Sequence, residues 1–172
     1  MVKQDFDKVI RDFLAYFQII VKNLNFTHNN MIPIVTIQKS NKTLQGLRNV
    51  VSEVSFHKDA ELAAIQDGWL EFIQTHVDNF ESSDTLKELN NYLLNKVYFV
   101  GNEFGSVDIL IYYLLYNVFV SKTQHLIQAL NLSLQEKEKY INVSRWFNAI
   151  QHNQKARSTR SLIPFSRCCL YN

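Results

Sequence analysis

The chain has 172 residues, the size of one domain or of two small domains packed as a unit. Apolar residues make up 47% and charged residues 20% of it, which excludes a disordered chain and allows a sizeable core. With only 4 Gly and 2 Pro it has little material for tight turns, which disfavours an all-β sandwich or barrel and favours long helices.

The formal net charge of +2 is too small to indicate a partner, but its distribution is uneven. Residues 1–58 carry 8 basic and 4 acidic side chains, residues 59–132 carry 3 and 10, and residues 133–172 carry 7 and 2. An acidic middle between basic ends is consistent with different partners for different faces, or simply with uneven surface charge.

The two cysteines, Cys168 and Cys169, are adjacent, so they cannot staple a fold, and no metal-ligand spacing exists. This pattern indicates a reducing compartment, and the charged first residues show no signal peptide. The longest apolar run, 107–120, is interrupted by Asp108 and Asn117. It is too short to cross a bilayer, so we expect a buried core helix and no membrane association.

Hydrophobic periodicity predicts the elements of the first third of the chain. Apolar residues at helical spacing predict one amphipathic helix from about Gln4 to Leu24. A β-branched run then predicts a strand, followed by a turn, a short strand and a short helix, at 31–37, 40–42, 43–44 and 47–54.

After residue 58 the patterns are helical only. A stripe from 62 to 80 predicts one helix, and Ser82-Ser83-Asp84 predicts the N-cap of the next. Ser133 and Glu136 have the S-x-x-E spacing of a capping box, expected to open a final helix with an inward face. That face holds Tyr140, Val143, Trp146, Phe147 and Ile150. We therefore predict an α/β unit over 1–56, a helical unit over 59–155 and a basic tail over 156–172.

The element order resembles the glutathione transferase architecture, and two local motifs support this. Ile32-Pro33 before a strand is similar to the cis-proline position of thioredoxin-like domains, which implies a structural cis-proline at Pro33. The run Phe104-Gly105-Ser106-Val107-Asp108-Ile109 resembles the family motif at the start of the central buried helix. There, Gly105 is the cap, Asp108 the third helical residue, and Phe104 and Ile109 are placed for a hydrophobic staple. The expected fold is mainly α: a reduced thioredoxin-like α/β N-terminal half followed by an all-helical C-terminal half.

Longer strings resemble the translation elongation factor 1 epsilon family, also called the third aminoacyl-tRNA synthetase complex-interacting multifunctional protein. They are IPIVTIQKSNKTLQGLRNVV at 32–51, IQDGWLEF at 65–72, LNNYLLNKVYFVGNEF at 89–104 and SLQEKEKYINVSRWFNAIQH at 133–152. The resemblance implies a non-catalytic scaffold of the cytosolic multi-synthetase complex. Implied partners are methionyl-tRNA synthetase and glutamyl-prolyl-tRNA synthetase, bound through their glutathione-transferase-like domains. It also implies a nuclear role after DNA damage.

Catalysis is not expected from these residues. A first helix that starts at about Gln4 leaves almost no room for a preceding strand with a nucleophile. The glutathione-binding pair of transferases is expected at Gln45-Gly46, where Gly46 lacks the necessary hydroxyl. The five His residues are scattered, so no metal site or cofactor is expected. A glutathione transferase-type enzyme nevertheless remains an alternative.

One polar stripe of the last predicted helix is the candidate partner-binding surface. It carries Asn142, Arg145, Ala149 and His152, spaced by three and four residues. An Arg beside a small Ala can approach a partner helix and fork onto a carboxylate. The resemblance implies that this face contacts glutamyl-prolyl-tRNA synthetase; an ordinary solvated helix face is the alternative.

Three further interactions are considered. The family resemblance implies that the α/β half, together with 59–80, docks on methionyl-tRNA synthetase. The basic tail, with Lys155, Arg157, Arg160 and Arg167, could contact tRNA phosphates weakly or be a solvated terminus. A tRNA-binding accessory protein and a homodimeric structural protein are therefore the remaining alternatives.

Overall fold

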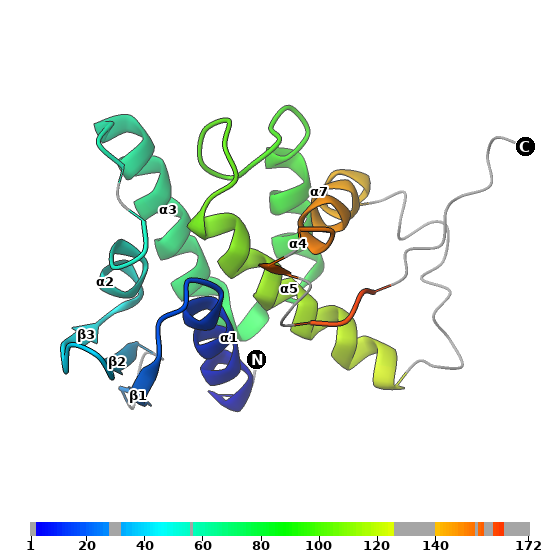
Figure 1. Cartoon of the computed structure of the whole chain (residues 1–172). Helices are drawn as coiled ribbons and strands as arrows, with labels where there is room; N and C mark the ends of the chain where they lie inside the picture. The colour runs from blue at the N-terminus through cyan, green and yellow to red at the C-terminus, as the bar shows by residue number, and fades with distance from the viewer. Residues whose placement is uncertain are drawn as a thin grey trace, which may run out of the picture.

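The computed structural model describes residues 3–27, 32–55, 57–125, 140–153, 155–156 and 160–163. The chain is mainly helical, with one small sheet at one end of the molecule (Figure 1). Its elements are α1 Lys3–Tyr16, β1 Val21–Phe26, β2 Pro33–Ile37, β3 Thr43–Gln45, α2 Leu47–Ser52, α3 Ala60–His76, the 3-10 turn η1 Val77–Asn79, α4 Ser83–Tyr92, α5 Ser106–His125 and α7 Ile141–Gln151. We call residues 3–55 the α/β half and residues 57–156 the helical half.

The first helix is shorter than the sequence predicts. The helix ends at Tyr16, and Gln18 has a left-handed φ of 62° that turns the chain. The expected extension to Leu24 is therefore wrong, because the next residues form β1 instead. In β1 the buried side chains alternate, with Leu24 and Phe26 facing the core, which is the period of a strand.

The sheet has the order β1-β2-β3, and both neighbouring pairs are antiparallel. Val35 of β2 lies opposite Leu24 of β1 and Leu44 of β3, and all three side chains are buried on one face. The predicted turn before β3 is confirmed, with Asn41 at a left-handed φ of 52°. The small sheet thus packs one apolar face on the helices.

Pro33 is not a cis-proline. The described residues contain no cis peptide bond, so the Ile32–Pro33 bond is trans. Pro33 is the first residue of β2, a position where a strand tolerates a residue without an N–H. Its carbonyl accepts a hydrogen bond from the Gly46 amide at 2.8 Å. That carbonyl is used inside the fold rather than offered to a ligand.

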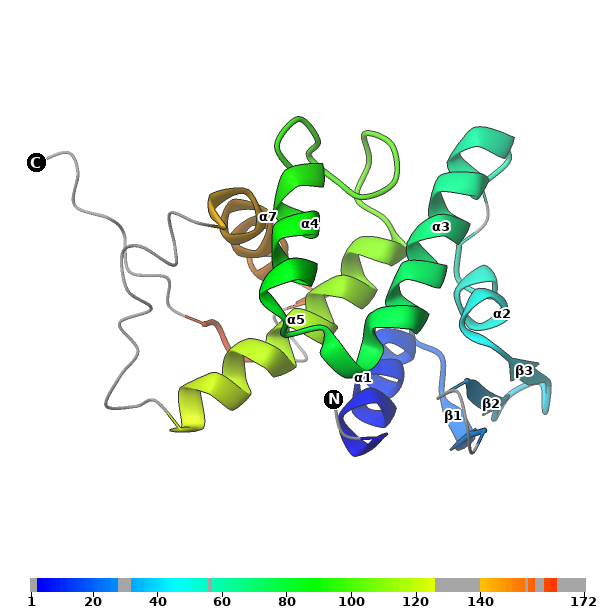
Figure 2. The same ribbon diagram turned by 180° about the vertical axis from the view of Figure 1, so that it is seen from behind.

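Helix α5 is the centre of the molecule, with α1, α3 and α7 packed against it (Figures 1 and 2). Its residues 109–116 are all almost completely buried, which confirms the predicted core helix. Because α1 packs directly on α5, the α/β half and the helical half share one continuous hydrophobic core. Among the described helices, none has the length and apolar character needed to span a bilayer.

Two predicted helix starts have different outcomes. At α4 the prediction is confirmed, because Ser82 is the N-cap and its Oγ accepts from the Thr85 amide at 3.1 Å. The last described helix, α7, begins at Ile141, after Tyr140 with a non-helical φ of −125°. Residues Ser133 and Glu136 lie outside the described part of the chain.

Residues 160–163, which we call the C-terminal strap, pack on the core. Arg160 forms an ion pair with Asp12 of α1, and its guanidinium lies 4.9 Å from the ring centre of Tyr116 of α5. The Gln151 side chain of α7 donates to the Ile163 carbonyl and accepts from its amide, both at 3.1 Å. Over its described residues the predicted tail is therefore part of the folded unit, while Arg157, Arg167, Cys168 and Cys169 are not described.

Candidate functional site

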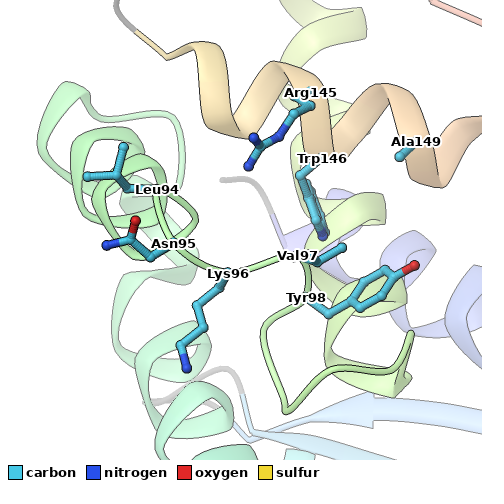
Figure 3. Close-up of a pocket in the computed structure, with 8 residues that line it drawn as sticks. All are labelled: Leu94, Asn95, Lys96, Val97, Tyr98, Arg145, Trp146 and Ala149. Atoms are coloured by element: carbon cyan, nitrogen blue, oxygen red, sulfur yellow. The ribbon is translucent and has the colours of Figure 1, made fainter.

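A surface pocket of about 470 Å³ opens between α7 and the segment that follows α4 (Figure 3). Eight residues line it: Leu94, Asn95, Lys96, Val97, Tyr98, Arg145, Trp146 and Ala149. The first five belong to the segment 94–98 and the last three to α7. Two elements about 50 residues apart in sequence thus form one concave surface, which we call the docking pocket.

The rim of the docking pocket is both apolar and cationic. Leu94 is 61% exposed and Val97 is 66% exposed, unusually high values for large aliphatic side chains. Lys96 and Arg145 add two positive charges, and none of the eight lining residues is acidic. Such a surface suits a partner that presents apolar side chains beside a carboxylate.

Arg145 has a defined orientation over this pocket. One guanidinium nitrogen, Nη2, donates to the Leu93 carbonyl at 3.1 Å, at the C-terminal end of α4, where helix carbonyls lack intrahelical partners. Within the described part of the chain, Arg145 has no carboxylate partner. Its other N–H groups have no protein acceptor among the residues that the structure describes.

The other residues of the predicted stripe divide into two groups. Ala149 is exposed and lines the docking pocket, and His152 is exposed at the end of α7, with its Nδ1 at 2.7 Å from the Asn148 carbonyl. Asn142 is buried, so its assignment to the partner-binding surface is wrong.

Asn142 instead joins α7 to α4. Its backbone amide donates to Asn90 Oδ1 at 3.0 Å, and its Nδ2 donates to the Asn90 carbonyl at 3.2 Å. The first amides of a helix lack intrahelical acceptors, and the Asn90 side chain supplies one for α7. The exposed part of the predicted stripe is therefore limited to Arg145, Ala149 and His152.

Beneath the pocket, the Asp108 side chain joins three segments. Its Oδ1 accepts from the Trp146 Nε1 at 2.9 Å and from the Phe99 amide at 3.2 Å. Its Oδ2 accepts from the Gly105 amide at 3.1 Å, as a third helical residue does in a capping box. The predicted capping role of Gly105 and Asp108 is thus confirmed, with a tryptophan bond that the sequence did not indicate.

Burial decides the electrostatics of Asp108. The residue is completely buried, and desolvation of its carboxylate raises its pKa to about 6. The hydrogen bonds from Trp146, Phe99 and Gly105 act in the opposite direction, because they stabilise the charged form. Asp108 therefore takes up a proton at a higher pH than an exposed aspartate does.

The predicted hydrophobic staple is only partly visible. Ile109 is fully buried, and Phe104 is half-buried against the core. The Phe104 ring lies 5.9 Å from the Tyr98 ring and 6.5 Å from the Tyr16 ring, measured between centroids. A direct Phe104–Ile109 contact stays a prediction.

The segment 94–98 was not identified as part of a site from the sequence alone. Leu94 fits the helical stripe of α4, so its periodicity places it in the core. The helix ends at Tyr92, with Leu93 as its C-cap, and Leu94 therefore leaves the buried face. The available signal was the pair Leu94 and Val97, two large aliphatic residues on either side of Asn95 and Lys96, in a segment without regular structure.

The described residues contain no metal site, and the position expected for a glutathione-binding pair carries a glycine. No group of three or more His, Cys, Asp or Glu side chains there could hold a metal ion. Gln45 is exposed at the end of β3, and Gly46 has a φ of 89°, a left-handed conformation that a Ser would adopt only with strain. The backbone at this position thus favours the glycine that is present.

Sequence comparison places these features in a family. The family model described as nuclear-export cofactor Arc1p matches residues 62–154, just over half of the chain. Eukaryotic translation elongation factor 1 epsilon-1 from Homo sapiens and from Mus musculus are each 43% identical over 116 residues, or 65% of this chain. The chain spans about 61% of the length of these curated relatives. The chain belongs to the translation elongation factor 1 epsilon family.

Proposed function

We propose that the chain is a non-catalytic docking subunit of the multi-aminoacyl-tRNA synthetase complex and acts there in support of translation. The docking pocket carries this proposal, because all eight of its lining residues lie within the family-matched residues 62–154. The names of the relatives connect the family to translation. An exposed apolar and cationic pocket supports binding to a protein rather than chemistry on a small substrate.

The partner we propose for the docking pocket is the glutathione-transferase-like domain of glutamyl-prolyl-tRNA synthetase. Arg145 would fork onto a carboxylate of that domain with N–H groups that no described residue accepts, while Leu94 and Val97 cover apolar side chains. Ala149 allows a partner helix to approach α7 closely because it has only a methyl group. Docking at this face leaves the opposite, buried face of α7 unchanged.

A second partner, methionyl-tRNA synthetase, is proposed for the α/β half together with α3. In Figure 2 the sheet, α2 and α3 lie toward one end of the molecule and α7 lies toward the other, so both partners could bind at once. Such bivalent binding is what a bridging scaffold requires. In line with this role, we propose that the chain acts in the cytoplasm; the nuclear role after DNA damage remains a proposal from family resemblance.

A glutathione transferase activity is less well supported. The left-handed backbone of Gly46 disfavours the serine of the glutathione-binding pair, and the Pro33 carbonyl is already bonded. We therefore propose that immobilised glutathione does not retain the protein. Specific elution with free glutathione would contradict this part of the proposal.

Binding of tRNA as the main function is also less well supported. Arg160, one of the four tail cations, is buried in its ion pair with Asp12 and is not available to phosphates. The segment 59–88 places exposed acidic side chains on α3 and α4, which repel a polyanion. Tight, salt-sensitive binding of tRNA by the isolated chain would favour this alternative.

Calorimetry with the glutamyl-prolyl-tRNA synthetase domain tests the proposal at Arg145. Arg145→Ala should weaken binding by about thirtyfold or more, because a partner carboxylate loses its paired contact. Arg145→Lys should recover only part of this, since an ammonium group cannot make two parallel bonds. Arg11→Ala is the matched control, because Arg11 is an exposed arginine on α1 that pairs with Asp7 of the same helix, away from the docking pocket. Equal affinity of Arg145→Ala and the parent chain would contradict the assignment.

For the second partner, a surface variant is better than a deletion. Removing residues 1–56 would expose the core of α5, because α1 packs on it. Asn49→Arg instead adds bulk to the exposed face of α2, on the α/β half. It should weaken binding to the methionyl-tRNA synthetase domain and leave binding to the glutamyl-prolyl domain unchanged. The reverse pattern would show that the two surfaces are wrongly assigned.

A further inference from the structure

Asp108 connects the two walls of the docking pocket from below. Trp146 lines the pocket from α7, and its Nε1 donates to Asp108 Oδ1. The same oxygen accepts from the Phe99 amide, directly after the lining segment 94–98. The bond from Gly105 to the other carboxylate oxygen fixes the start of α5. One buried side chain therefore holds both walls, although it does not line the pocket itself.

We propose that Asp108 is a positioning residue of the docking pocket, whose carboxylate form holds α7 and the segment 94–98 in the binding geometry and whose carboxyl form loosens them. The effect of Asp108 on partner binding rests on the proposed function. The positioning itself is a property of the free protein and can be measured there.

The chemistry of the three bonds gives the direction of the effect. A carboxylate accepts from all three N–H groups, and bonds to a charged acceptor are the stronger kind. A proton on Oδ2 would place an O–H group against the Gly105 N–H, so that this bond is lost. The bonds from Trp146 and Phe99 to Oδ1 would remain, but with a neutral and weaker acceptor. Protonation thus relieves the burial of charge and loosens the pocket at the same time.

The titration range of this group lies above that of an exposed aspartate. The groups that face the carboxyl are the Trp146 indole from α7, the Phe99 amide, and the Gly105 and Asp108 amides at the start of α5. From α3, Gln66 accepts from the neighbouring Ser106 hydroxyl at 3.3 Å. Arg145 turns to the Leu93 carbonyl instead. Within the described part of the chain, no charged side chain faces Asp108, and burial raises its pKa to about 6.

The first measurement follows the indole N–H resonance of Trp146 in the free, full chain labelled with ¹⁵N, between pH 5 and 7.5. Trp146→Phe assigns this resonance against that of Trp69. In the parent chain it should shift with a midpoint of about 6, and in Asp108→Asn it should stay constant. Ser82→Ala is the matched control, because it removes a helix cap of α4 without touching the pocket, and it should keep the parent titration. An indole resonance that does not shift in this range overturns the proposal.

The second measurement is the affinity for the glutamyl-prolyl-tRNA synthetase domain at pH 7.5 and 5.5. The parent chain should bind about fivefold more weakly at the lower pH. The reason is that hydrogen bonds to a neutral carboxyl group are weaker than those to a carboxylate, so the pocket loosens. The Asp108→Asn variant should bind at both pH values as the parent chain does at pH 5.5. The parent chain and Asp108→Asn differ at residue 108 alone, so the difference between their pH profiles of binding reports Asp108.

The outcomes separate the two proposals. If the indole titrates but the parent chain and Asp108→Asn have the same pH profile of binding, Asp108 does not position the pocket for docking and the proposal fails, while the proposed function stands. If the indole titrates and the parent chain binds the domain at neither pH, the proposed partner is wrong and positioning of the pocket is upheld in the free protein.

Discussion

Two aspartates, the buried Asp108 and the partly buried Asp12, join distant segments of this molecule, and they do so in different ways. At the start of α5, Asp108 accepts from three uncharged N–H groups and meets no cation in the described chain. Where α1 meets the C-terminal strap, Asp12 pairs with Arg160, whose guanidinium also lies over the Tyr116 ring. The first junction depends on hydrogen-bond geometry, and the second on a charge pair.

The difference decides how each junction responds to change. Burial raises the pKa of both carboxyl groups, but Arg160 counteracts the effect at Asp12, whereas only hydrogen bonds do so at Asp108. The Asp12 side chain keeps 23% exposure, and Asp108 has none. We therefore expect Asp108 to be the more sensitive of the two, both to substitution and to pH.

The largest effect is expected for Asp108→Ala. It leaves the amides of Phe99 and Gly105 and the Trp146 indole without their acceptor in a buried site. The free energy of unfolding should fall by about 3–5 kcal/mol, since each orphaned group costs about 1–3 kcal/mol and relief of the buried charge returns part of it. Urea denaturation measures this; a loss below that of the cap variant Ser82→Ala, about 1 kcal/mol, would contradict the central place of Asp108.

The next largest effect is expected where the strap meets α1. Arg160→Ala leaves Asp12 partly buried without its cation, and the free energy of unfolding should fall by about 2 kcal/mol, less than for a fully buried pair. The double variant Asp12→Asn with Arg160→Ala should lose less free energy of unfolding than the two single variants lose when their losses are added. Additive losses in urea denaturation would show that the two side chains do not stabilise each other.

Acid should sharpen the contrast between the two aspartates. A carboxyl group whose folded pKa lies above its unfolded value binds more protons in the folded state, so its stabilising effect is present at low pH and is lost as pH rises through the folded pKa. For Asp108 this window runs from about 4 to about 6. Through this group, lowering the pH from 7 to 4 should raise the free energy of unfolding by on the order of 2–3 kcal/mol.

The Asp108→Asn variant tests that assignment directly. Its free energy of unfolding should depend less on pH between pH 4 and 7 than that of the parent chain. The pH dependence that remains should include the smaller effect of Asp12. Thermal unfolding at a series of pH values measures both profiles. Parallel profiles would mean that Asp108 does not titrate in this window.

The smallest stability effect is expected for Arg145→Ala. The side chain is exposed, but its bond to the Leu93 carbonyl satisfies one group at the end of α4. The free energy of unfolding should fall by about 0.5–1 kcal/mol, the net contribution of one hydrogen bond. A loss of several kcal/mol would mean that the binding test at Arg145 reports folding rather than contact.

Local signals predicted the features that depend on neighbouring residues. The Ser82 cap bonds an amide three residues away, and Asp108 bonds the Gly105 amide at the same spacing, so both follow from short-range motifs. The β2–β3 hairpin follows from a β-branched run and an Asn-containing turn. Each of these needs no knowledge of the rest of the chain.

Features that depend on distant partners were not predictable in this way. Asn142 has the spacing of a surface residue, but its partner Asn90 lies 52 residues away in sequence. Arg160 belongs to a basic tail by composition, and only the position of α1 provides Asp12 as its partner. The first helix was extended too far because its apolar spacing continues beyond Tyr16, whereas the backbone turn at Gln18 leaves no mark on that spacing.

The docking pocket depends on such long-range placement too, and its apolar rim offers the most direct test of the proposed function. Leu94→Ser combined with Val97→Ser changes two side chains that are 61% and 66% exposed, so the fold should be unaffected. Calorimetric titration of the full chain with the glutathione-transferase-like domain of glutamyl-prolyl-tRNA synthetase should show binding by the parent chain. The rim variant should bind at least about tenfold more weakly, as expected when apolar contacts at an interface are lost. Equal affinity of the two proteins, or no binding by the parent chain, would contradict docking through this pocket.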